Sequence, residues 1–596
     1  MCGIIGYIGK RKASEVLYRG LKRLEYRGYD SCGIGVVNNN KLIIKKDVGK
    51  VEEVAKKEGF LEIEGNIGIG HNRWATHGKV SKENAHPHTD CLDRIAIVHN
   101  GIITNYKELK EELIKKGHKF KSETDTEVIA HLIEEELNKF DEYNEENYIK
   151  AVKNALKKIK GSYALSIINK DFPNLLIGAR YESPLILGIG ENEFFLGSDV
   201  TAFLDYTNRA VPLEDGDIVV VKNNSYYIEN NGKIVKRKEI EIKWNIEQAE
   251  KQGFPHFMLK EIFEQPETIK VSAKISSEEI KEVAKLIDKF NKVYFVGAGT
   301  SYHACLYAEY LFSKLNKLVK AEDASEFLNK SVVDNDTLVV GITQSGETYD
   351  TLKALKYAKE KGAKTAAIVN VIGSTATRIV DIPILMGAGI EIAVCATKTF
   401  TSQLMIIYRL FLEYGKIKDR NMNKYEQVIN KIPNYIKEVL NQSEHIKNIA
   451  ESLKAQNYIF ISKGINLVSA LEGALKFKEI TYLHAEGMSA GMLKHGTISL
   501  IDENFDTIAI VPPKDSKVFS SILSNIEEVR ARNGRVIAVT PIKINDCDNI
   551  TVPNVLEEIS PIVYAPAYQL LAYYKAVQLK RDVDKPRGLA KSVTVE

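Results

Sequence analysis

A cysteine stands second in the chain, in the stretch MCGIIGYIGK. A cysteine there can be a small apolar side chain at the start of a buried strand. If the initiator methionine is removed, however, Cys2 carries both a thiol and the free α-amino group of the chain. That amine has a pKa of about 7.7–8.0 and can act as a base near neutral pH. Cys2 is therefore a candidate nucleophile that carries its own base.

Histidines are concentrated between positions 71 and 99, a segment that contains His71, His77, His86, His88 and His99. Imidazole is a common zinc ligand, but no two of these histidines have helical i, i+4 spacing, and no cysteine stands at zinc-finger distance. We therefore expect no metal site. The alternative is a polar pocket for an α-amino acid.

Such a pocket needs a cation and an anion, and the sequence offers both. Arg73 can clamp a carboxylate with two hydrogen bonds, and Asp125 can bind an ammonium group. Asn100 and Gly101, in VHNGI, can supply a side-chain amide and a backbone N–H to an oxyanion. Together with the thiol and terminal amine of Cys2, these groups indicate hydrolysis of the glutamine amide.

Two loops in the second half of the chain, GAGTS and TQSGET, each follow an apolar strand and precede a helix. Backbone N–H groups at such helix starts bind anions. Neither loop matches a nucleotide-binding motif, which favours a small phosphorylated metabolite. The alternative is that the hydroxyls only cap two helices. The side chains available for a phosphate are Thr300, Ser301, Thr343, Gln344, Ser345 and Thr348.

The segment LEGALKFKEITYLHAEG predicts a helix with Glu472, Lys476 and Glu479 on one face. A solvated salt-bridge face is one interpretation. The other is a carboxylate base beside a lysine, which suits proton transfer between carbons next to a carbonyl.

Two further residues are candidates for carbonyl chemistry. His495, in LKHG, can open a sugar ring by proton transfer. The C-terminal tail, KPRGLAKSVTVE, reads either as a frayed end or, because Val593 and Val595 are apolar, as a packed segment. A packed tail would hold Lys591 in place, ready to form an imine with a carbonyl substrate.

The elements that must position these residues follow two different patterns. Roughly the first 240 residues predict short strands and few helices, including a hairpin over 32–49 around an Asn-rich turn and a helix over 123–140 capped by Thr124 or Asp125. Beyond a charged linker the pattern becomes strand, loop and helix, which predicts parallel sheets. This pattern recurs at an offset of about 165 residues, so we infer two copies of one α/β domain.

Composition limits the class of protein. The chain has 596 residues with 82 basic and 79 acidic side chains, a balance that argues against a nucleic-acid partner. Its six cysteines are scattered, which indicates a reducing compartment. Neither a secretory signal nor an apolar stretch long enough for a membrane span is visible, so we expect a cytoplasmic protein without a membrane partner.

Long motifs resemble a known family. MCGIIGYIG, LEYRGYDS, RWATHG, NAHPH, VHNGIITN and SETDTEVIAHL resemble the glutaminase domain of N-terminal-nucleophile amidotransferases. GTSYHA, TQSGETYDT, EGALKFKEI, LKHG and LAKSVTVE resemble paired sugar-isomerase (SIS) domains. Both halves in this order are similar to the family of glutamine–fructose-6-phosphate aminotransferases (isomerising).

The resemblance implies an α+β glutaminase domain, with antiparallel sheets sandwiched by helices, over 2–238. A linker over 239–256 follows, then two α/β parallel-sheet SIS domains over 257–425 and 440–587, and a tail over 588–596. It implies that ammonia released from L-glutamine aminates D-fructose 6-phosphate, with no cofactor. A homodimer is expected from the resemblance alone.

The resemblance also implies roles for individual residues. Cys2 is the nucleophile and Trp74 the gate of an ammonia channel. Lys591 forms the imine, Glu479 is the isomerisation base, His495 opens the ring, and Lys476 and Glu472 support them. Residues around the oxyanion and the glutamine are Asn100, Gly101, Arg73, Thr76, His77, His86 and Asp125. Residues around the sugar phosphate are Thr300, Ser301, Gln344, Ser345, Thr348 and Val394.

Other proteins share parts of this pattern. A purine-pathway amidotransferase needs an acidic phosphoribosyl-pyrophosphate loop, and an asparagine synthetase needs S-G-G-x-D-S; neither stretch is present. A sugar-phosphate sensor built on SIS domains has no need of Cys2, Glu479, His495 and Lys591 together. A deaminase or deglycase made of SIS domains alone would lack the first 240 residues.

Overall fold

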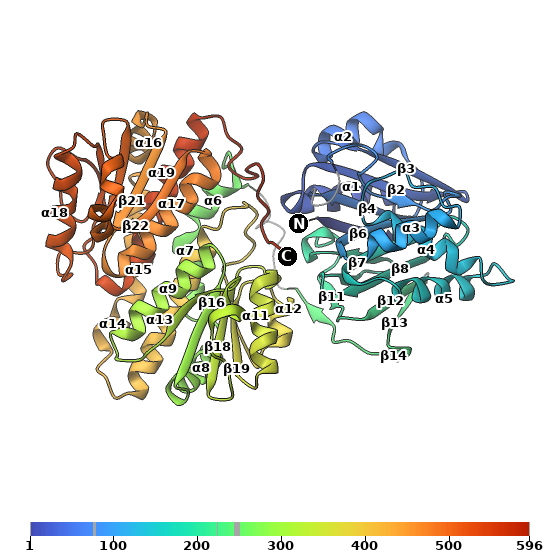
Figure 1. The fold of residues 1–596 in the computed structure, drawn as a ribbon, viewed down its shortest axis with the longest axis horizontal. Coiled ribbons are helices and arrows are strands. Elements are labelled where there is room, and N and C mark those ends of the chain that lie inside the picture. The colour runs from blue at the N-terminus through green and yellow to red at the C-terminus, as the bar shows by residue number, and fades with distance from the viewer. Residues whose placement is uncertain (1, 75–78, 223, 243–250, 595–596) are drawn as a thin grey trace. The chain divides into compact units, whose positions relative to one another are not determined.

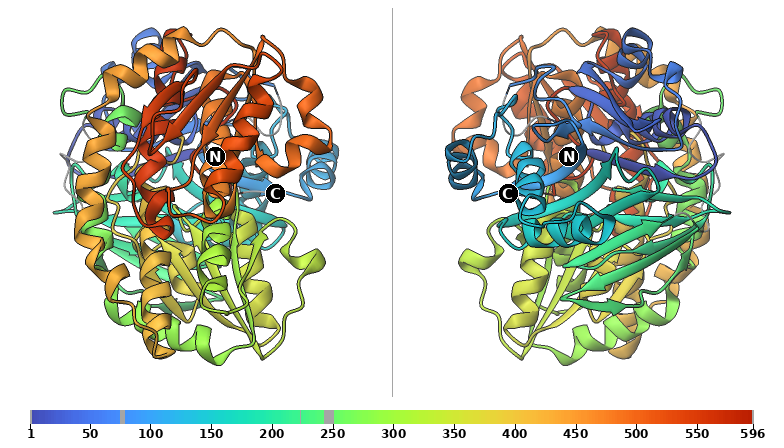
Figure 2. Two further views of the ribbon diagram at one scale, coloured as in Figure 1. Left: turned by 90° about the vertical axis from the view of Figure 1, so that its left-hand side faces the viewer. Right: turned by 90° about the vertical axis from the view of Figure 1, so that its right-hand side faces the viewer.

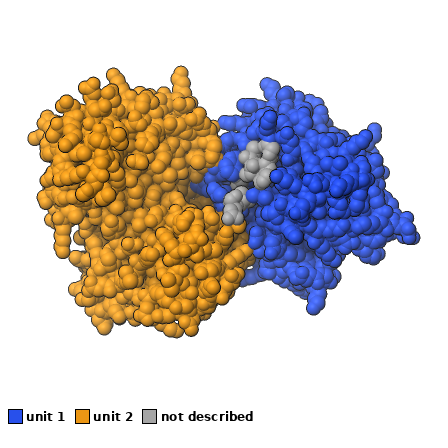
Figure 3. All heavy atoms as spheres, in the orientation of Figure 1, with its two compact units in different colours: residues 1–246, 590–596 blue, residues 247–589 orange. Residues whose placement is uncertain are grey.

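Strands of the first 242 residues pair only antiparallel, and strands of the remainder pair only parallel, in this computed structural model. The structure describes residues 2–74, 79–222, 224–242 and 251–594. The chain forms two compact units, shown in Figure 3: unit 1 comprises 1–246 with 590–596, and unit 2 comprises 247–589. The expected change from antiparallel to parallel sheets is confirmed.

Unit 1 contains two antiparallel sheets (Figure 1). The first has the order β15 (Ile240–Glu241), β11 (Arg209–Pro212), β9 (Ile186–Ile189), β10 (Phe194–Gly197), β1 (Gly3–Ile8), β4 (Ile67–Arg73), β2 (Ser31–Asn38), β3 (Lys41–Val48). The second has the order β14 (Lys233–Val235), β13 (Ser225–Asn230), β12 (Asp217–Lys222), β8 (Leu175–Tyr181), β7 (Gly161–Asn169), β6 (Ile95–Ile103), β5 (His88–Thr89).

The alternation of side chains along each strand builds a four-layer unit. Ile4 and Ile69 of the first sheet pack against Val98 and Ile168 of the second in one buried core. The opposite face of the second sheet, with Ile97, packs against α3 (Tyr106–Lys115), α4 (Glu127–Leu137) and α5 (Glu145–Leu156). Helices α1 (Ala13–Leu24) and α2 (Val51–Glu58) lie against the first sheet (Figure 2, right). The predicted sandwich of sheets between helices is confirmed.

Two local predictions in unit 1 have different outcomes. The β2–β3 hairpin forms as expected, because Asn39 and Asn40 take positive φ angles of 48° and 57°, which suit a tight hairpin turn. The expected caps of α4, Thr124 and Asp125, are wrong, because the helix begins at Glu127, after them. The side chain of Asp125 instead accepts a hydrogen bond from the Ile103 N–H at 2.8 Å.

Unit 2 contains two five-stranded parallel sheets with the same strand order, which confirms the internal repeat. The first has the order β17 (Lys320–Asp323), β16 (Lys292–Gly297), β18 (Thr337–Thr343), β19 (Lys364–Val369), β20 (Ile382–Leu385). The second has the order β22 (His484–Ser489), β21 (Asn457–Ser462), β23 (Phe505–Ile510), β24 (Val536–Thr540), β25 (Asp548–Thr551).

Both faces of each sheet are covered by helices. On β16, Phe295 faces α8 (Ser277–Lys289), α9 (Thr300–Ser313) and α13 (Lys398–Ile417), whereas Val296 faces α11 (Tyr349–Glu360) and α12 (Thr375–Ile379). On β21, Phe460 faces α17 (Leu467–Thr481) and α19 (Ser560–Gln578), whereas Ile461 faces α18 (Phe519–Arg530). Phe295 and Phe460 belong to one continuous core, so the two SIS sheets are joined by packed helices.

Shorter helices complete unit 2: α6 (Phe257–Phe263), α7 (Gln265–Ser272), α10 (Phe327–Lys330), α14 (Asn423–Gln427), α15 (Ile432–Leu440) and α16 (Ser443–Ser452). In the part of the chain that the structure describes, no helix is long and apolar enough to cross a membrane. In the tail, Ser592 is buried and Lys591 half-buried, whereas Val593 is 44% exposed, so the packed alternative holds at Ser592 but not at Val593. Val595 lies outside the described residues.

Candidate active site

The thiol of Cys2 stands directly before β1 and beside the end of β4. Gly3 pairs with Asn72 in the β1–β4 register, which brings Cys2 next to the last residues of β4. The backbone N–H of Trp74 donates a hydrogen bond to the Cys2 sulfur at 3.2 Å, and the thiol lies 3.5 Å from the Trp74 carbonyl oxygen. These contacts hold a half-buried sulfur at a defined place at the ends of two central strands of the sheet.

The predicted oxyanion residues lie near the end of β6. The side-chain amide of Asn100 donates to the Cys2 carbonyl oxygen at 2.9 Å, and its own oxygen lies 3.0 Å from Nε2 of His71. Gly101 has φ +129°, and a Cβ there would lie 2.1 Å from the Ser162 carbonyl oxygen, so only glycine fits. Asn100 is therefore held against the residue that carries the candidate nucleophile.

Arg73 and Asp125 carry opposite charges and interact with each other electrostatically. Arg73 is buried at the end of β4, where desolvation lowers its pKa while the charges of Cys2 and Asp125 act in the opposite direction. One guanidinium nitrogen of Arg73 donates to the Lys79 carbonyl oxygen at 3.2 Å. Asp125 is buried as well and is fixed through the Ile103 N–H. Thr76 and His77, also predicted for this pocket, lie outside the described residues.

His71, His86 and His88 form a buried stack rather than a charged cluster. The His86 ring stacks on His71 at 4.0 Å between centroids and meets His88 edge-on at 4.6 Å. Desolvation lowers the pKa of His71 to about 3 and the pKa values of His86 and His88 well below the usual one, so all three are neutral at pH 7. His86 also lies 3.0 Å from the Thr126 hydroxyl, so it supports His71, which in turn contacts Asn100.

In unit 2 the predicted helix face is a buried ionic network. Lys476, only 1% exposed, has its ammonium 2.6 Å from Glu479 and 3.4 Å from Glu472. It donates to the Thr300 hydroxyl at 3.1 Å, and that hydroxyl donates to Glu472 at 3.0 Å. His303, which the sequence did not single out, lies 2.7 Å from Glu472 through Nδ1. The solvated salt-bridge interpretation of this face is therefore wrong.

This network joins helix α17 of the second SIS domain to the first turn of helix α9 in the first SIS domain. Burial alone lowers the pKa of Lys476, but the charges of Glu472 and Glu479 outweigh burial and raise it above its usual value. The lysine is therefore a permanent cation. Of the three charged residues on this face of α17, Glu479 is the most exposed, with 20% of its side chain accessible.

The two predicted phosphate loops follow neighbouring parallel strands, β16 and β18. The chain leaves β16 for β17 on one side and returns to β18 on the other, and ligands of open α/β sheets bind at such a switch point. In the second loop, the Thr343 and Thr348 hydroxyls are 2.9 Å apart, and Thr343 accepts from the Gly346 N–H at 3.2 Å. In the first, the Ser301 hydroxyl accepts from the Gln403 amide at 3.1 Å.

The other predicted sugar-site residues are dispersed. Val394 is buried, and its N–H donates to the Asp584 carbonyl oxygen at 2.9 Å. His495 is exposed at the end of the 3₁₀ helix η7 (Ala490–His495), and among the described residues no hydrogen bond or ion pair joins it to the Lys476 network. Lys591 belongs to the segment counted with unit 1, so its juxtaposition with Glu479 stays a prediction.

Four more side chains come together in unit 1 that the sequence did not single out: Cys91, His118, His131 and Glu134. The available signal was the i, i+3 spacing of His131 and Glu134, which puts both on one face of α4. Cys91 and His118 stand 40 and 13 residues before His131, so no local pattern joins them to the helix.

Comparison with known families matches both units. A model described as "Glutamine amidotransferase domain" matches residues 71–205, and the model "SIS domain" matches residues 286–413 and 453–577. The C-terminal domain of glucosamine-fructose-6-phosphate aminotransferase from Francisella tularensis superposes with a TM-score of 0.53 at 34% identity, over 56% of this chain and 99% of that one. The fold and the site thus define an amidotransferase domain joined to two SIS domains.

Two relatives extend over nearly the whole chain, both called "Glutamine--fructose-6-phosphate aminotransferase [isomerizing]". The protein of Methanococcus maripaludis is 64% identical over 100% of both chains. That of Methanocaldococcus jannaschii is 72% identical over 92% of this chain, which spans about half, 51%, of that relative's length. The chain belongs to the family of glutamine–fructose-6-phosphate aminotransferases (isomerizing).

Proposed function

We propose that the protein converts L-glutamine and D-fructose 6-phosphate to L-glutamate and D-glucosamine 6-phosphate. The proposal rests on the presence of two sites in one chain. Unit 1 holds a thiol beside a candidate oxyanion donor, and unit 2 holds a buried acid–lysine network beside the loops that follow β16 and β18. The names of the full-length relatives agree with this reaction.

In the first half-reaction, the Cys2 sulfur attacks the glutamine amide carbon and ammonia leaves, after which water hydrolyses the thioester to glutamate. The free α-amine of Cys2 serves as the base once methionine is removed; Met1 itself lies outside the described residues. Asn100 and Gly101 donate hydrogen bonds to the oxyanion. Arg73 binds the substrate carboxylate and Asp125 its ammonium group, in a pocket completed by Thr76, His77 and His86.

In the second half-reaction, His495 opens the sugar ring and Lys591 forms an imine with the C2 carbonyl, releasing water. Ammonia displaces the lysine, which leaves a C2 imine on the sugar. Glu479 then moves a proton from C1 to C2 while the proton of the C1 hydroxyl passes to the imine nitrogen, which converts the imine to the amine and the C1 alcohol to an aldehyde. Lys476 and Glu472 keep Glu479 charged and oriented, and the phosphate is held by Thr300, Ser301, Gln344, Ser345 and Thr348, near Val394.

Ammonia must pass between the two sites without meeting bulk water, because water would protonate it and the resulting ammonium ion is not a nucleophile. Trp74, which directly follows β4 and contacts the Cys2 sulfur, is the proposed gate of that passage. We further propose a cytoplasmic homodimer, on the basis of the scattered cysteines and the resemblance.

The test compares Cys2→Ala with Cys547→Ser, a cysteine of unit 2 that has no role in the proposal. Each protein is incubated with fructose 6-phosphate and either glutamine or an ammonium salt, and glutamate and amino sugar are measured. We expect Cys2→Ala to lose both products with glutamine and to keep amino-sugar formation with ammonium, and Cys547→Ser to resemble the parent. Undiminished amino-sugar formation by Cys2→Ala with glutamine would falsify the proposal.

A further inference from the structure

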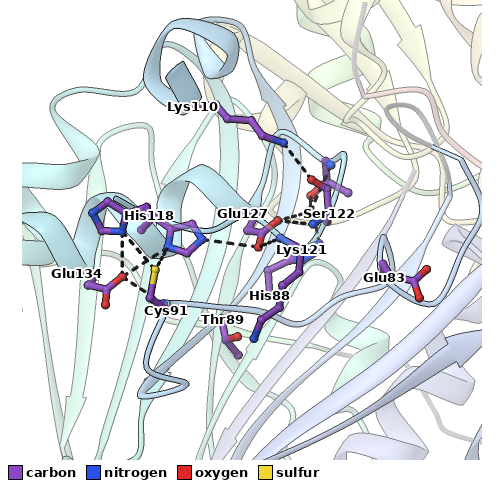
Figure 4. Close-up of polar contacts among 12 residues, drawn as sticks. Glu83, His88, Thr89, Cys91, Lys110, His118, Lys121, Ser122, Glu127 and Glu134 are labelled. Carbon is purple, nitrogen blue, oxygen red and sulfur yellow. Dashed lines mark hydrogen bonds and ion pairs between the residues drawn. The ribbon is translucent and has the colours of Figure 1, made fainter. Parts of the chain in front are cut away.

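Three separate segments of unit 1 bring metal-binding side chains to one point (Figure 4). Cys91 lies in the turn after β5, and His118 follows α3. His131 and Glu134 project from adjacent turns of α4. Three of these four side chains are largely buried, whereas Cys91 is exposed and leaves the group open to entry of an ion.

Four of the six distances between donor atoms agree with the edges of a tetrahedral coordination shell, and all four donor atoms lie within 4.8 Å of one another. The Cys91 sulfur lies 3.5 Å from Nδ1 of His118 and 3.4 Å from Nδ1 of His131. One oxygen of Glu134 lies 3.1 Å from the first of these nitrogens and 3.5 Å from the second. Zinc bond lengths of about 2.3 Å to sulfur and 2.0–2.1 Å to nitrogen and oxygen give tetrahedral edges of about 3.6 Å for S···N and 3.3 Å for N···O.

The outer nitrogens of both histidines also have carboxylate neighbours. Nε2 of His118 lies 3.3 Å from Glu135, and Nε2 of His131 lies 3.6 Å from Glu127. Metal-bound histidines almost always present the second ring nitrogen to a carboxylate, a carbonyl or water, which fixes the ring and raises its basicity. Both Nδ1 atoms therefore point inward, toward the same sulfur and the same carboxylate oxygen.

A hydrogen-bonded cluster without a metal is the alternative. In such a cluster both ring Nδ1–H groups would donate to one oxygen of Glu134, at 3.1 and 3.5 Å, and that oxygen already accepts from the backbone N–H of Cys91 at 3.1 Å, so a single oxygen would take three hydrogen bonds. A thiolate and a carboxylate with two neutral imidazoles and one divalent cation are electrically neutral and satisfy every inward-facing atom. This set of one sulfur, two nitrogens and one oxygen favours zinc over the hard cations magnesium and calcium.

We propose that Cys91, His118, His131 and Glu134 form a structural site for a divalent ion of zinc-like preference. All four positions are taken by protein atoms, which is typical of structural rather than catalytic zinc. The ion ties the turn after β5 and the segment after α3 to helix α4. The ion takes no part in the proposed chemical steps, and the site was not predicted from the sequence.

The site is connected to the candidate glutamine pocket through Glu127. This carboxylate accepts hydrogen bonds from the backbone N–H groups of Lys121 and Ser122 at 2.7 and 2.6 Å (Figure 4). It also lies 3.6 Å from Nε2 of His131. The same loop continues to Asp125. Binding of the ion therefore stabilises the loop that carries a residue of the proposed pocket.

The first experiment uses the full chain, stripped with a chelator and titrated with Co²⁺, which reports its geometry by absorption. We expect saturation at one equivalent, with the intense visible bands of tetrahedral cobalt and a near-ultraviolet thiolate-to-cobalt band, and displacement of cobalt by Zn²⁺. Weak octahedral bands, or no uptake at one equivalent, would overturn the proposal, and neither result depends on a variant that folds.

The second experiment uses variants in the same titration. Glu135→Gln, which removes an outer partner of His118, should weaken cobalt binding roughly 10- to 100-fold and keep the thiolate band. Cys91→Ser should weaken cobalt binding by more than this and remove the thiolate band. The matched control, His445→Ala with Cys547→Ser, removes a histidine and a cysteine of unit 2 and should bind like the parent. A thiolate band that persists in Cys91→Ser, or is lost in the control, would show adventitious binding elsewhere.

Discussion

Replacement of Lys476 by methionine tests the buried network in unit 2. The ammonium is 1% exposed and lies 2.6 Å from Glu479 and 3.4 Å from Glu472, whose side chain is fully buried. Methionine fills a similar volume but leaves two carboxylates without their cation. Removal of one partner of a buried ion pair costs about 3–5 kcal/mol. Glu472 keeps its hydrogen bonds to Thr300 and His303, so we expect a loss near the lower end, about 3 kcal/mol.

The loss of unfolding free energy in Lys476→Met should depend on pH. Without Lys476, mutual repulsion and burial raise the pKa values of the two carboxylates above their unfolded values near 4.3. The folded variant then binds a proton more tightly than the unfolded chain, so its deficit in unfolding free energy should shrink as the pH falls from about 8 to about 5. In the parent, the raised pKa of Lys476 contributes stability that is lost only as the pH rises above about 10.

The assay is denaturant unfolding at several pH values, followed by far-ultraviolet circular dichroism, on the full chain. Lys478→Met is the matched control, since Lys478 lies two positions along the same helix but is exposed. We expect its unfolding curve to match the parent within about 0.5 kcal/mol. An equal loss in both variants, or a deficit in Lys476→Met that does not change with pH, would refute the reasoning from burial.

Two further predictions concern unit 1. Asn100→Ala removes a proposed oxyanion donor and should lower the rate of glutamate release about 10²- to 10³-fold, measured with saturating glutamine; a rate within threefold of the parent would contradict the role. His71, whose pKa burial lowers to about 3, is neutral when folded but takes up a proton on unfolding below about pH 6.5. The unfolding free energy of unit 1 should therefore fall as the pH drops from 6 to 4, by up to about 1.4 kcal/mol per pH unit from this group, and less steeply in His71→Phe, as measured by denaturant unfolding at each pH.

Much of the architecture was predictable because its signals are local. The Asn-rich turn specifies the β2–β3 hairpin, since asparagine tolerates the positive φ angles that the turn requires. Strand, loop and helix units recur in both SIS domains, and right-handed parallel crossovers leave few ways to arrange them. The position of the α4 start was not predictable, because Asp125 is used to bind the Ile103 N–H rather than to cap the helix.

For the candidate sites, too, some features were predictable from the sequence and others were not. The sequence by itself determined which chemical groups are present: a thiol at the second position, an Asn-Gly pair, hydroxyl-rich loops after strands and an acid–lysine–acid helix face. Whether Glu472 and Lys476 lie in solvent or in a buried network, and whether His71 is charged, depends on what packs over them.

Only the tertiary structure decided which distant residues meet. Thr300 and Glu472 are 172 positions apart and share a hydrogen bond, and Cys91 meets His131 across 40 positions. Local periodicity sets how a segment coils and which face it buries, but strand register and helix packing set which side chains converge. Burial then shifts the pKa values of these side chains, because removal of water disfavours the charged form, and the extent of burial depends on every element packed around the group.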